Sequence, residues 1–133
     1  MSHLFVAAVC ALIRKDGKIL AMRRSLSKDA SPGIWEAVSG RIEPSEEPLD
    51  AVRREIEEET GLTVDLEPRP LSAHQAFRAQ TPMVILYYLA DWKSGEVRMS
   101  EEHDAWEWLD AQTFSERTPI QALAQAARQI LSK

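Results

Sequence analysis

The sequence predicts an α/β fold in which helices pack on a mixed β-sheet. Short apolar runs separated by hairpin-like turns, a helix between two groups of strands, and a C-terminal amphipathic helix all favour this class. The chain has 133 residues, of which 44% are hydrophobic and 28% charged. This length and composition fit one globular domain over residues 1–133.

The first two strands are marked by apolar, β-branched runs. Phe5–Arg14 and Lys18–Arg24 flank Lys15–Gly17, and the Asp-Gly pair in this segment favours a tight hairpin. Ser25–Gly33 has the composition of a loop. Ile34–Val38 is then expected to form a short strand that ends in a turn at Ser39 and Gly40.

A helix is predicted from Pro48 to Thr60. Proline suits the first position of a helix, and Gly61 stands where a helix commonly ends. Leu49, Val52 and Ile56 fall on one face of this helix and predict its buried stripe.

The second half of the chain predicts further strands and a terminal helix. Leu62–Leu66, Met83–Trp92 and Ala105–Leu109 read as strands. Thr118 and Pro119 are expected to cap and start the last helix. One face of that helix carries its apolar side chains: Ile120, Leu123, Ala127, Ile130 and Leu131.

Composition and charge exclude several classes of protein. The net charge of −5 argues against binding to nucleic acid polymers, which need a basic face. No apolar run approaches the roughly 20 residues that span a bilayer, and Met1–Ile13 lacks the features of a signal peptide, so we expect no membrane association and a cytoplasmic location. Cys10, the only cysteine, lies in an apolar run and is expected in the core.

The negative charge is concentrated in one segment. Gly40–Leu62 holds eight acidic and three basic residues, whereas acids and bases balance in the rest of the chain. On a helix with about 100° per residue, Glu55, Glu58 and Glu59 share a ledge beside the buried stripe. Neighbouring carboxylates repel one another, and a divalent cation reverses that interaction. A solvated acidic helix would have the same local pattern.

The full segment resembles the Nudix box, Gly-x5-Glu-x7-Arg-Glu-U-x-Glu-Glu-x-Gly-U, in which U is aliphatic. Every fixed position is matched, by Gly40, Glu46, Arg54, Glu55, Ile56, Glu58, Glu59, Gly61 and Leu62. Pro32–Glu36 also resembles the lead-in to the box in that family, and the size of the chain and the order of its elements are similar.

The resemblance implies a Nudix-type α/β/α sandwich with a mixed β-sheet and a MutT-like hydrolase that cuts a diphosphate linkage by attack of water at phosphorus. It places the metal ligands at Glu55, Glu58 and Glu59, with Mg²⁺, or Mn²⁺ as an alternative, as the ion. Arg54 is expected to orient a carboxylate. Ser39 and Ser45 replace glycines that are common in the family, which affects the expected loop conformation near Glu43.

The general base is expected to be either Glu55 or Glu102. Similar MutT-like proteins carry a functional glutamate six residues before a strand tryptophan, and Glu102 stands at that distance from Trp108. His103 is a weaker candidate, interpreted as a surface histidine.

Substrate contacts are expected at Arg23 and Arg24, where related proteins often direct an arginine towards phosphates, and at Gly40. The stretch His74–Arg78 is interpreted as an irregular loop that could line a base pocket. Trp35 and Trp106 are expected in or near the core, and the sequence does not say which aromatic ring would stack on a base.

The predicted substrate is a small nucleoside diphosphate derivative, either a nucleoside triphosphate or an ADP-sugar. The alternatives are a dinucleoside polyphosphate, a non-nucleotide diphosphate, or a non-catalytic Nudix-fold ligand-binding module. The intact box argues against that last alternative, and the apolar setting of Cys10 against an isoprenoid diphosphate isomerase. A homodimer is left open.

Overall fold

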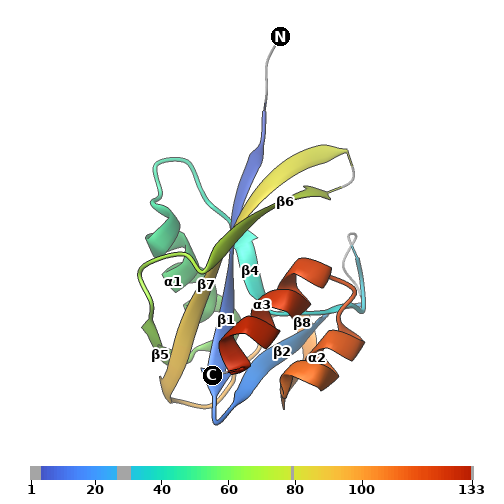
Figure 1. The fold of residues 1–133 in the computed structure, drawn as a ribbon. Coiled ribbons are helices and arrows are strands. Elements are labelled where there is room, and N and C mark those ends of the chain that lie inside the picture. Colours follow the sequence, from blue (N-terminus) through green and yellow to red (C-terminus); the bar gives the residue numbers. More distant parts are fainter. Residues whose placement is uncertain (1–3, 27–30, 79, 133) are drawn as a thin grey trace.

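The computed structural model describes residues 4–26, 31–78 and 80–132. Within these residues a mixed sheet lies between α1 on one face and α2 with α3 on the other (Figure 1). This arrangement is the α/β/α sandwich that the sequence predicts. The strands are β1 (Val6–Lys15), β2 (Lys18–Arg24), β3 (Trp35–Glu36), β4 (Val38–Arg41), β5 (Thr63–Leu66), β6 (Ser72–Arg78), β7 (Thr81–Ser94) and β8 (His103–Leu109). The helices are α1 (Pro48–Thr60), α2 (Ala111–Arg117) and α3 (Gln121–Leu131).

The sheet is built around two long parallel strands, β1 and β7, which pair from Val6 opposite Met83 to Arg14 opposite Asp91. The outer edge of β7 is covered by β6 along one half and by β5 along the other, both antiparallel. The other edge of β1 pairs with β4 and, near the hairpin, with β2. Strand β8 lies on the far edge of β2.

The predicted hairpin between the first two strands is confirmed. Asp16 and Gly17 have φ values of 51° and 77°, so both turn residues adopt the left-handed conformation that a tight two-residue turn requires.

The predicted loop Ser25–Gly33 lies partly outside the described residues, and the segment after it differs from the prediction. Instead of one strand and a turn at Ser39 and Gly40, the chain forms β3 against β2 and then β4 against β1. Ser39 lies opposite Cys10 and Gly40 opposite Val9 in an extended ladder. Small residues signalled a turn, but the gap between the diverging β1 and β2 strands needs a paired segment, and tertiary pairing decides the conformation.

Two more elements were not predicted. The stretch interpreted as an irregular loop is strand β6, which contains no β-branched residue and is defined by its pairing with β7. Helix α2 was missed as well. Asp110 caps α2 by accepting the Thr113 N–H at 2.8 Å. Thr118 ends α2, and therefore α3 begins at Gln121 rather than at Pro119.

Alternate residues of β1 face opposite sides of the sheet. Val9, Ala11 and Ile13 pack in a cluster with α1, whereas Cys10 and Leu12 pack in a cluster with α2 and α3. The predicted core position of Cys10 is therefore confirmed. The stripe on α1 is also confirmed, because Val52 and Ile56 are buried and Leu49 packs against the same cluster.

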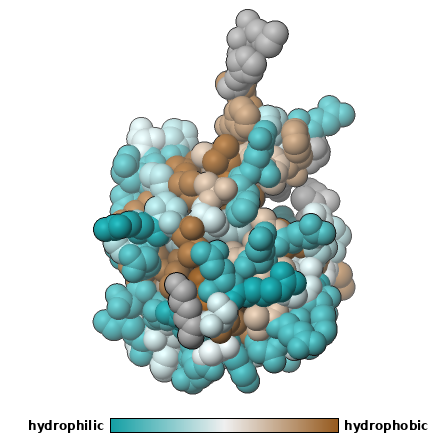
Figure 2. Space-filling model, viewed as in Figure 1, coloured by the Kyte–Doolittle hydropathy of each residue, from teal (hydrophilic) through white to brown (hydrophobic). Residues whose placement is uncertain are grey.

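The surface in view is mostly hydrophilic, with apolar patches around the upper end of β1 (Figure 2). Exposed large apolar side chains include Leu4, Phe5 and Phe77. Trp106, expected near the core, is 38% exposed because it lies on the outer strand β8. None of the helices in the described part of the chain is both long and apolar enough to cross a bilayer.

Candidate metal centre

Helix α1 and the loop before β8 bring five glutamates to one pocket. Glu55, Glu58 and Glu59 line it from the helix, and Ser100–Glu102 from the loop; its volume is about 330 Å³. Glu55 and Glu59 are buried, whereas the Glu58 side chain is 57% exposed. The structure therefore places Glu102 beside the three carboxylates that the sequence grouped on one helix face. Glu57 is exposed, as its position on the helix predicts.

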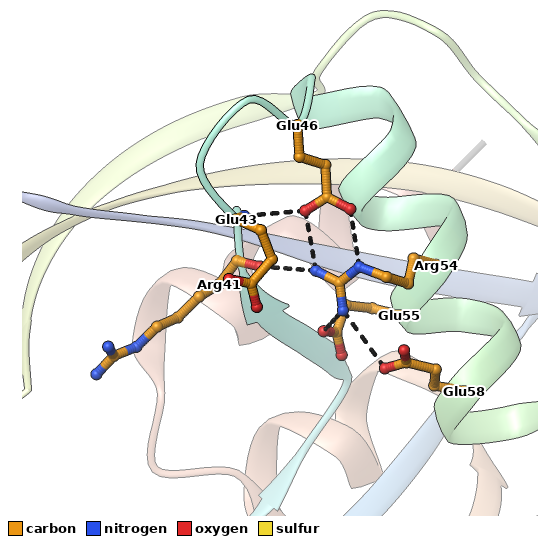
Figure 3. Close-up of polar contacts among 6 residues, drawn as sticks. All are labelled: Arg41, Glu43, Glu46, Arg54, Glu55 and Glu58. Carbon is orange, nitrogen blue, oxygen red and sulfur yellow. Dashed lines mark hydrogen bonds and ion pairs between the residues drawn. The ribbon is translucent and has the colours of Figure 1, made fainter.

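Arg54 contacts the carboxylates of Glu46, Glu55 and Glu58 (Figure 3). Its Nη1 donates to Glu55 Oε1 at 2.7 Å and lies 3.4 Å from Glu58 Oε2. Its Nε and Nη2 donate to the two oxygens of Glu46 at 2.8 and 3.0 Å, and Nη2 also donates to the Arg41 carbonyl at 3.0 Å. One planar guanidinium thus fixes the helix, the preceding loop and the end of β4 relative to one another.

Glu46 was part of the matched motif, but its role as an anchor was not predicted. It accepts both bonds of the Arg54 fork and also the Glu43 N–H at 2.9 Å. These bonds, led by that from Arg54, lower the pKa of Glu46 to about 2. The carboxylate is therefore charged at any physiological pH and serves to hold the arginine.

Gly40 provides room for Glu55. A Cβ atom at Gly40 would lie 2.2 Å from the Glu55 carboxyl carbon and 2.3 Å from its Oε1. Any side chain on this position of β4 would displace that carboxylate. The glycine is thus explained by a close approach, and contact between Gly40 and a substrate remains a prediction.

Among the helix carboxylates of this pocket, Glu59 is the most deeply buried. Its side chain is 1% exposed, and neither of its oxygens has a hydrogen-bond partner among the described residues. Burial and then the neighbouring Glu55 carboxylate raise the pKa of Glu59 well above its usual value. An acidic side chain in this position needs either a proton or a cation close to it.

The residues fit a hard divalent cation, since carboxylate oxygens are the ligands that Mg²⁺ and Mn²⁺ prefer. In the part of the chain that the structure describes, no three potential ligands already form a metal-ligand cluster. Arg54 Nη1 lies against both Glu55 and Glu58 in this arrangement. Binding of an ion would therefore require a rotation of these side chains.

The interpretation of His103 as a surface residue is wrong. Its side chain is fully buried, and its Nε2 lies 2.7 Å from Glu36 Oε2. Glu36 was not predicted as a site residue. Its signal is visible in the sequence: an acid stands within the apolar run Trp35–Val38, and a buried acid needs a partner.

The two arginines at the end of β2 already contact acids. Arg23 Nε lies 2.7 Å from Asp104 Oδ1, and Arg24 Nη1 lies 3.8 Å from Glu36 Oε2. Contact between either arginine and a phosphate stays a prediction. Trp35 is half-buried and packs against the cluster on the α2 and α3 face.

Comparison with known proteins identifies the family. The model of the NUDIX domain matches residues 3–132. An octanoyltransferase of Myxococcus xanthus is 34% identical over 85% of the chain, which spans only 32% of that protein. The asymmetrical bis(5'-nucleosyl)-tetraphosphatase of Mus musculus is 36% identical over 60% of the chain, which spans 59% of that protein. Nucleoside triphosphatase NudI of Escherichia coli is 32% identical, with 76% of the chain and 79% of NudI covered.

The fold agrees with this assignment. A MutT protein from Methanosarcina mazei superposes with a TM-score of 0.84, covers 99% of this chain and 96% of its own, and is 22% identical. The match of the domain model over nearly the whole chain, together with the intact motif on α1 and its preceding loop, shows that this protein belongs to the Nudix family.

Proposed function

We propose that this protein hydrolyses a diphosphate linkage in a small nucleoside diphosphate derivative, with Mg²⁺ or Mn²⁺ as the cofactor. The observation that carries the proposal is the buried carboxylate of Glu59, which lacks a donor and lies in a pocket shared with Glu55, Glu58 and Glu102. Such a group is costly in a purely structural role and is well suited to hold a cation.

Each side chain has a defined part in this proposal. Glu55, Glu58 and Glu59 would hold the ion, which neutralises phosphate charge and polarises the phosphoryl group when bound. Glu102 lines the same pocket and is one candidate for the base that accepts a proton from the attacking water; Glu55 is the other. Arg54, anchored by Glu46, keeps the Glu55 carboxylate oriented.

Phosphate contacts beyond the ion would come from the end of β2. Arg23 and Arg24 lie there, and each would exchange part of its present contact with an acid for a phosphate oxygen. A substrate contact at Gly40 would involve its main-chain atoms, because the space that a side chain would take there holds the Glu55 carboxylate.

The substrate classes to test are chosen from the similar proteins rather than from the shape of the pocket. The name of NudI favours a nucleoside triphosphate, and the name of the mouse relative favours a dinucleoside polyphosphate as the second candidate. An ADP-sugar is the third class to test. A non-catalytic ligand-binding module is disfavoured by the complete set of acidic residues in the pocket.

The test is a panel of these three substrate classes with Mg²⁺, scored by mass so that the bond cut is located. Reaction in ¹⁸O-labelled water identifies the phosphorus that is attacked. We expect magnesium-dependent release of a phosphate-containing product from at least one class. Absence of any metal-stimulated turnover across the panel would contradict the proposal and favour the binding module.

A further inference from the structure

Three buried polar atoms lie face to face at the edge of the candidate metal centre. Among the buried side-chain nitrogen and oxygen atoms of the described residues, those without a hydrogen-bond partner are both oxygens of Glu59 and Nδ1 of His103. His103 Nδ1 and Glu59 Oε1 are 3.7 Å apart. Buried polar atoms are nearly always paired in folded proteins, so unpaired atoms on two facing side chains require an explanation.

The far side of the His103 ring is firmly held. Nε2 lies 2.7 Å from Glu36 Oε2, and Arg24 Nη1 lies 3.8 Å from the same oxygen. These contacts follow from strand pairing, because β8 places His103 opposite Arg24 on β2, and β3 places Glu36 opposite Met22 on β2. The ring is therefore oriented with its Nδ1 edge towards Glu59.

We propose that His103, held by Glu36, is a positioning residue that orients Glu59 for a divalent ion. One proton between Nδ1 and Oε1 would give both atoms a partner, whichever of them carries it, and would leave Oε2 for the ion. The present distance is longer than a hydrogen bond, so the contact closes by a small movement of Glu59 towards the ring.

This inference rests on the proposed function, because it assigns Glu59 to the metal. It adds to that function the residues that orient the ligand Glu59, namely His103 and Glu36. Groups behind metal ligands commonly set the orientation of the ligand, and their loss weakens metal binding by about 10- to 100-fold. His103 acts through Glu59 and does not itself touch substrate in this proposal.

Two substitutions separate the two edges of the ring. In His103→Asn, the amide nitrogen takes roughly the place of Nδ1 and can still reach Glu59; in His103→Gln, it takes roughly the place of Nε2 and reaches Glu36 instead. Mn²⁺ binding to the full chain, measured by calorimetry without substrate, is the readout. We expect His103→Gln to weaken Mn²⁺ binding by about 10- to 100-fold and His103→Asn to weaken it several-fold less.

A control separates positioning from general loss of stability. Thr118 is buried between α2 and α3, where its Oγ1 accepts the Ile120 N–H at 3.2 Å. Thr118→Val should lower the melting temperature and leave Mn²⁺ affinity unchanged. If His103→Gln does not fold, Glu36→Gln replaces it, since this change weakens the hold on the ring and should also lower Mn²⁺ affinity.

Several results would overturn the inference: unchanged Mn²⁺ affinity in His103→Gln or in its replacement Glu36→Gln, equal losses in the Gln and Asn variants, or the same loss in Thr118→Val. Failure of the proposed function is seen separately. An unmodified protein that binds Mn²⁺ but cleaves no nucleotide would refute hydrolysis while the affinity comparison still decides the role of His103. An unmodified protein that binds no Mn²⁺ would overturn both.

Discussion

The pKa values of the glutamates on the two sides of the acidic site shift in opposite directions. On the Arg54 side, the half-buried Glu46 accepts three hydrogen bonds and has its pKa lowered to about 2. On the His103 side, Glu59 is buried without a donor and has its pKa raised. Two glutamates of one motif therefore differ in role. Glu46 has hydrogen-bond partners within the protein and is structural, whereas the charge of Glu59 would be stabilised by a bound cation.

The largest effect is expected from Glu59→Gln, which removes a ligand charge and keeps the shape. Loss of the charge that holds the ion should reduce turnover by about 100-fold or more, which corresponds to several kcal/mol of transition-state stabilisation. The melting temperature in EDTA should stay the same or rise, because an uncompensated buried acid is removed. Steady-state kinetics and thermal melts measure the two effects.

Glu57→Gln is the matched control, since Glu57 lies on the exposed face of the same helix. Its turnover should equal that of the unmodified protein. If Glu59→Gln behaves like this control, Glu59 is not a metal ligand.

Arg54→Gln should remove the hydrogen bonds that orient Glu46 and Glu55. It leaves Glu46 and Glu55 without their common partner, and we expect a loss of about 10- to 100-fold in turnover. The free energy of unfolding should fall by only about 1–2 kcal/mol, because Arg54 is partly exposed and solvent screens its contacts. Kinetics and urea unfolding test this prediction; Arg53→Gln on the exposed surface is the control, and equal effects in both variants would refute the anchoring role.

Gly40→Ala tests the close approach between β4 and Glu55. The added Cβ would overlap the Glu55 carboxylate and displace it, so Mn²⁺ affinity and turnover should both fall by about tenfold. Gly17→Ala is the control, because it should affect stability and not the metal site. Its Cβ meets nothing within 4 Å, but φ is +77°, so it should cost about 1 kcal/mol of stability and leave turnover intact. Normal Mn²⁺ affinity in Gly40→Ala would mean that Glu55 adapts without cost.

The smallest effect is a pH dependence that differs between the two sides. The folded-state pKa of Glu59 is raised above its usual value of 4.5, so its contribution to stability is present below pH 4.5 and is lost as pH rises above it. Glu46 has the reverse sign: its contribution is present above pH 4.5 and is lost as pH falls towards 2.

In EDTA, the melting temperature should therefore decline from pH 5 to pH 9 more steeply in the unmodified protein than in Glu59→Gln. Mg²⁺ should flatten the decline because it favours the charged carboxylate. An identical pH profile for the two proteins in EDTA would show that burial does not raise the pKa of Glu59.

The sequence predicted the features that depend on local pattern. The 3.6-residue period placed Val52 and Ile56 inward and grouped Glu55, Glu58 and Glu59, and the Asp16-Gly17 pair marked its hairpin. The motif also supplied the sandwich architecture through family resemblance. The helix faces and the hairpin share one property: neighbours along the chain determine them.

The missed features depend on partners distant in sequence. Strand β6 is defined by pairing with β7, and the strand at Ser39 and Gly40 by the gap beside β1. The buried His103 contacts Glu36, which is 67 residues away in the chain. No periodicity connects such positions, so the pair that supports Glu59 becomes visible only in three dimensions.

The most direct test of the central claim is a crystal of the unmodified protein grown with Mn²⁺ and measured at the manganese absorption edge. An ion held by α1 predicts an anomalous peak within coordination distance of Glu55, Glu58 and Glu59. Peaks found only elsewhere, or a Glu59 carboxylate that still faces no cation at saturating Mn²⁺, would contradict it.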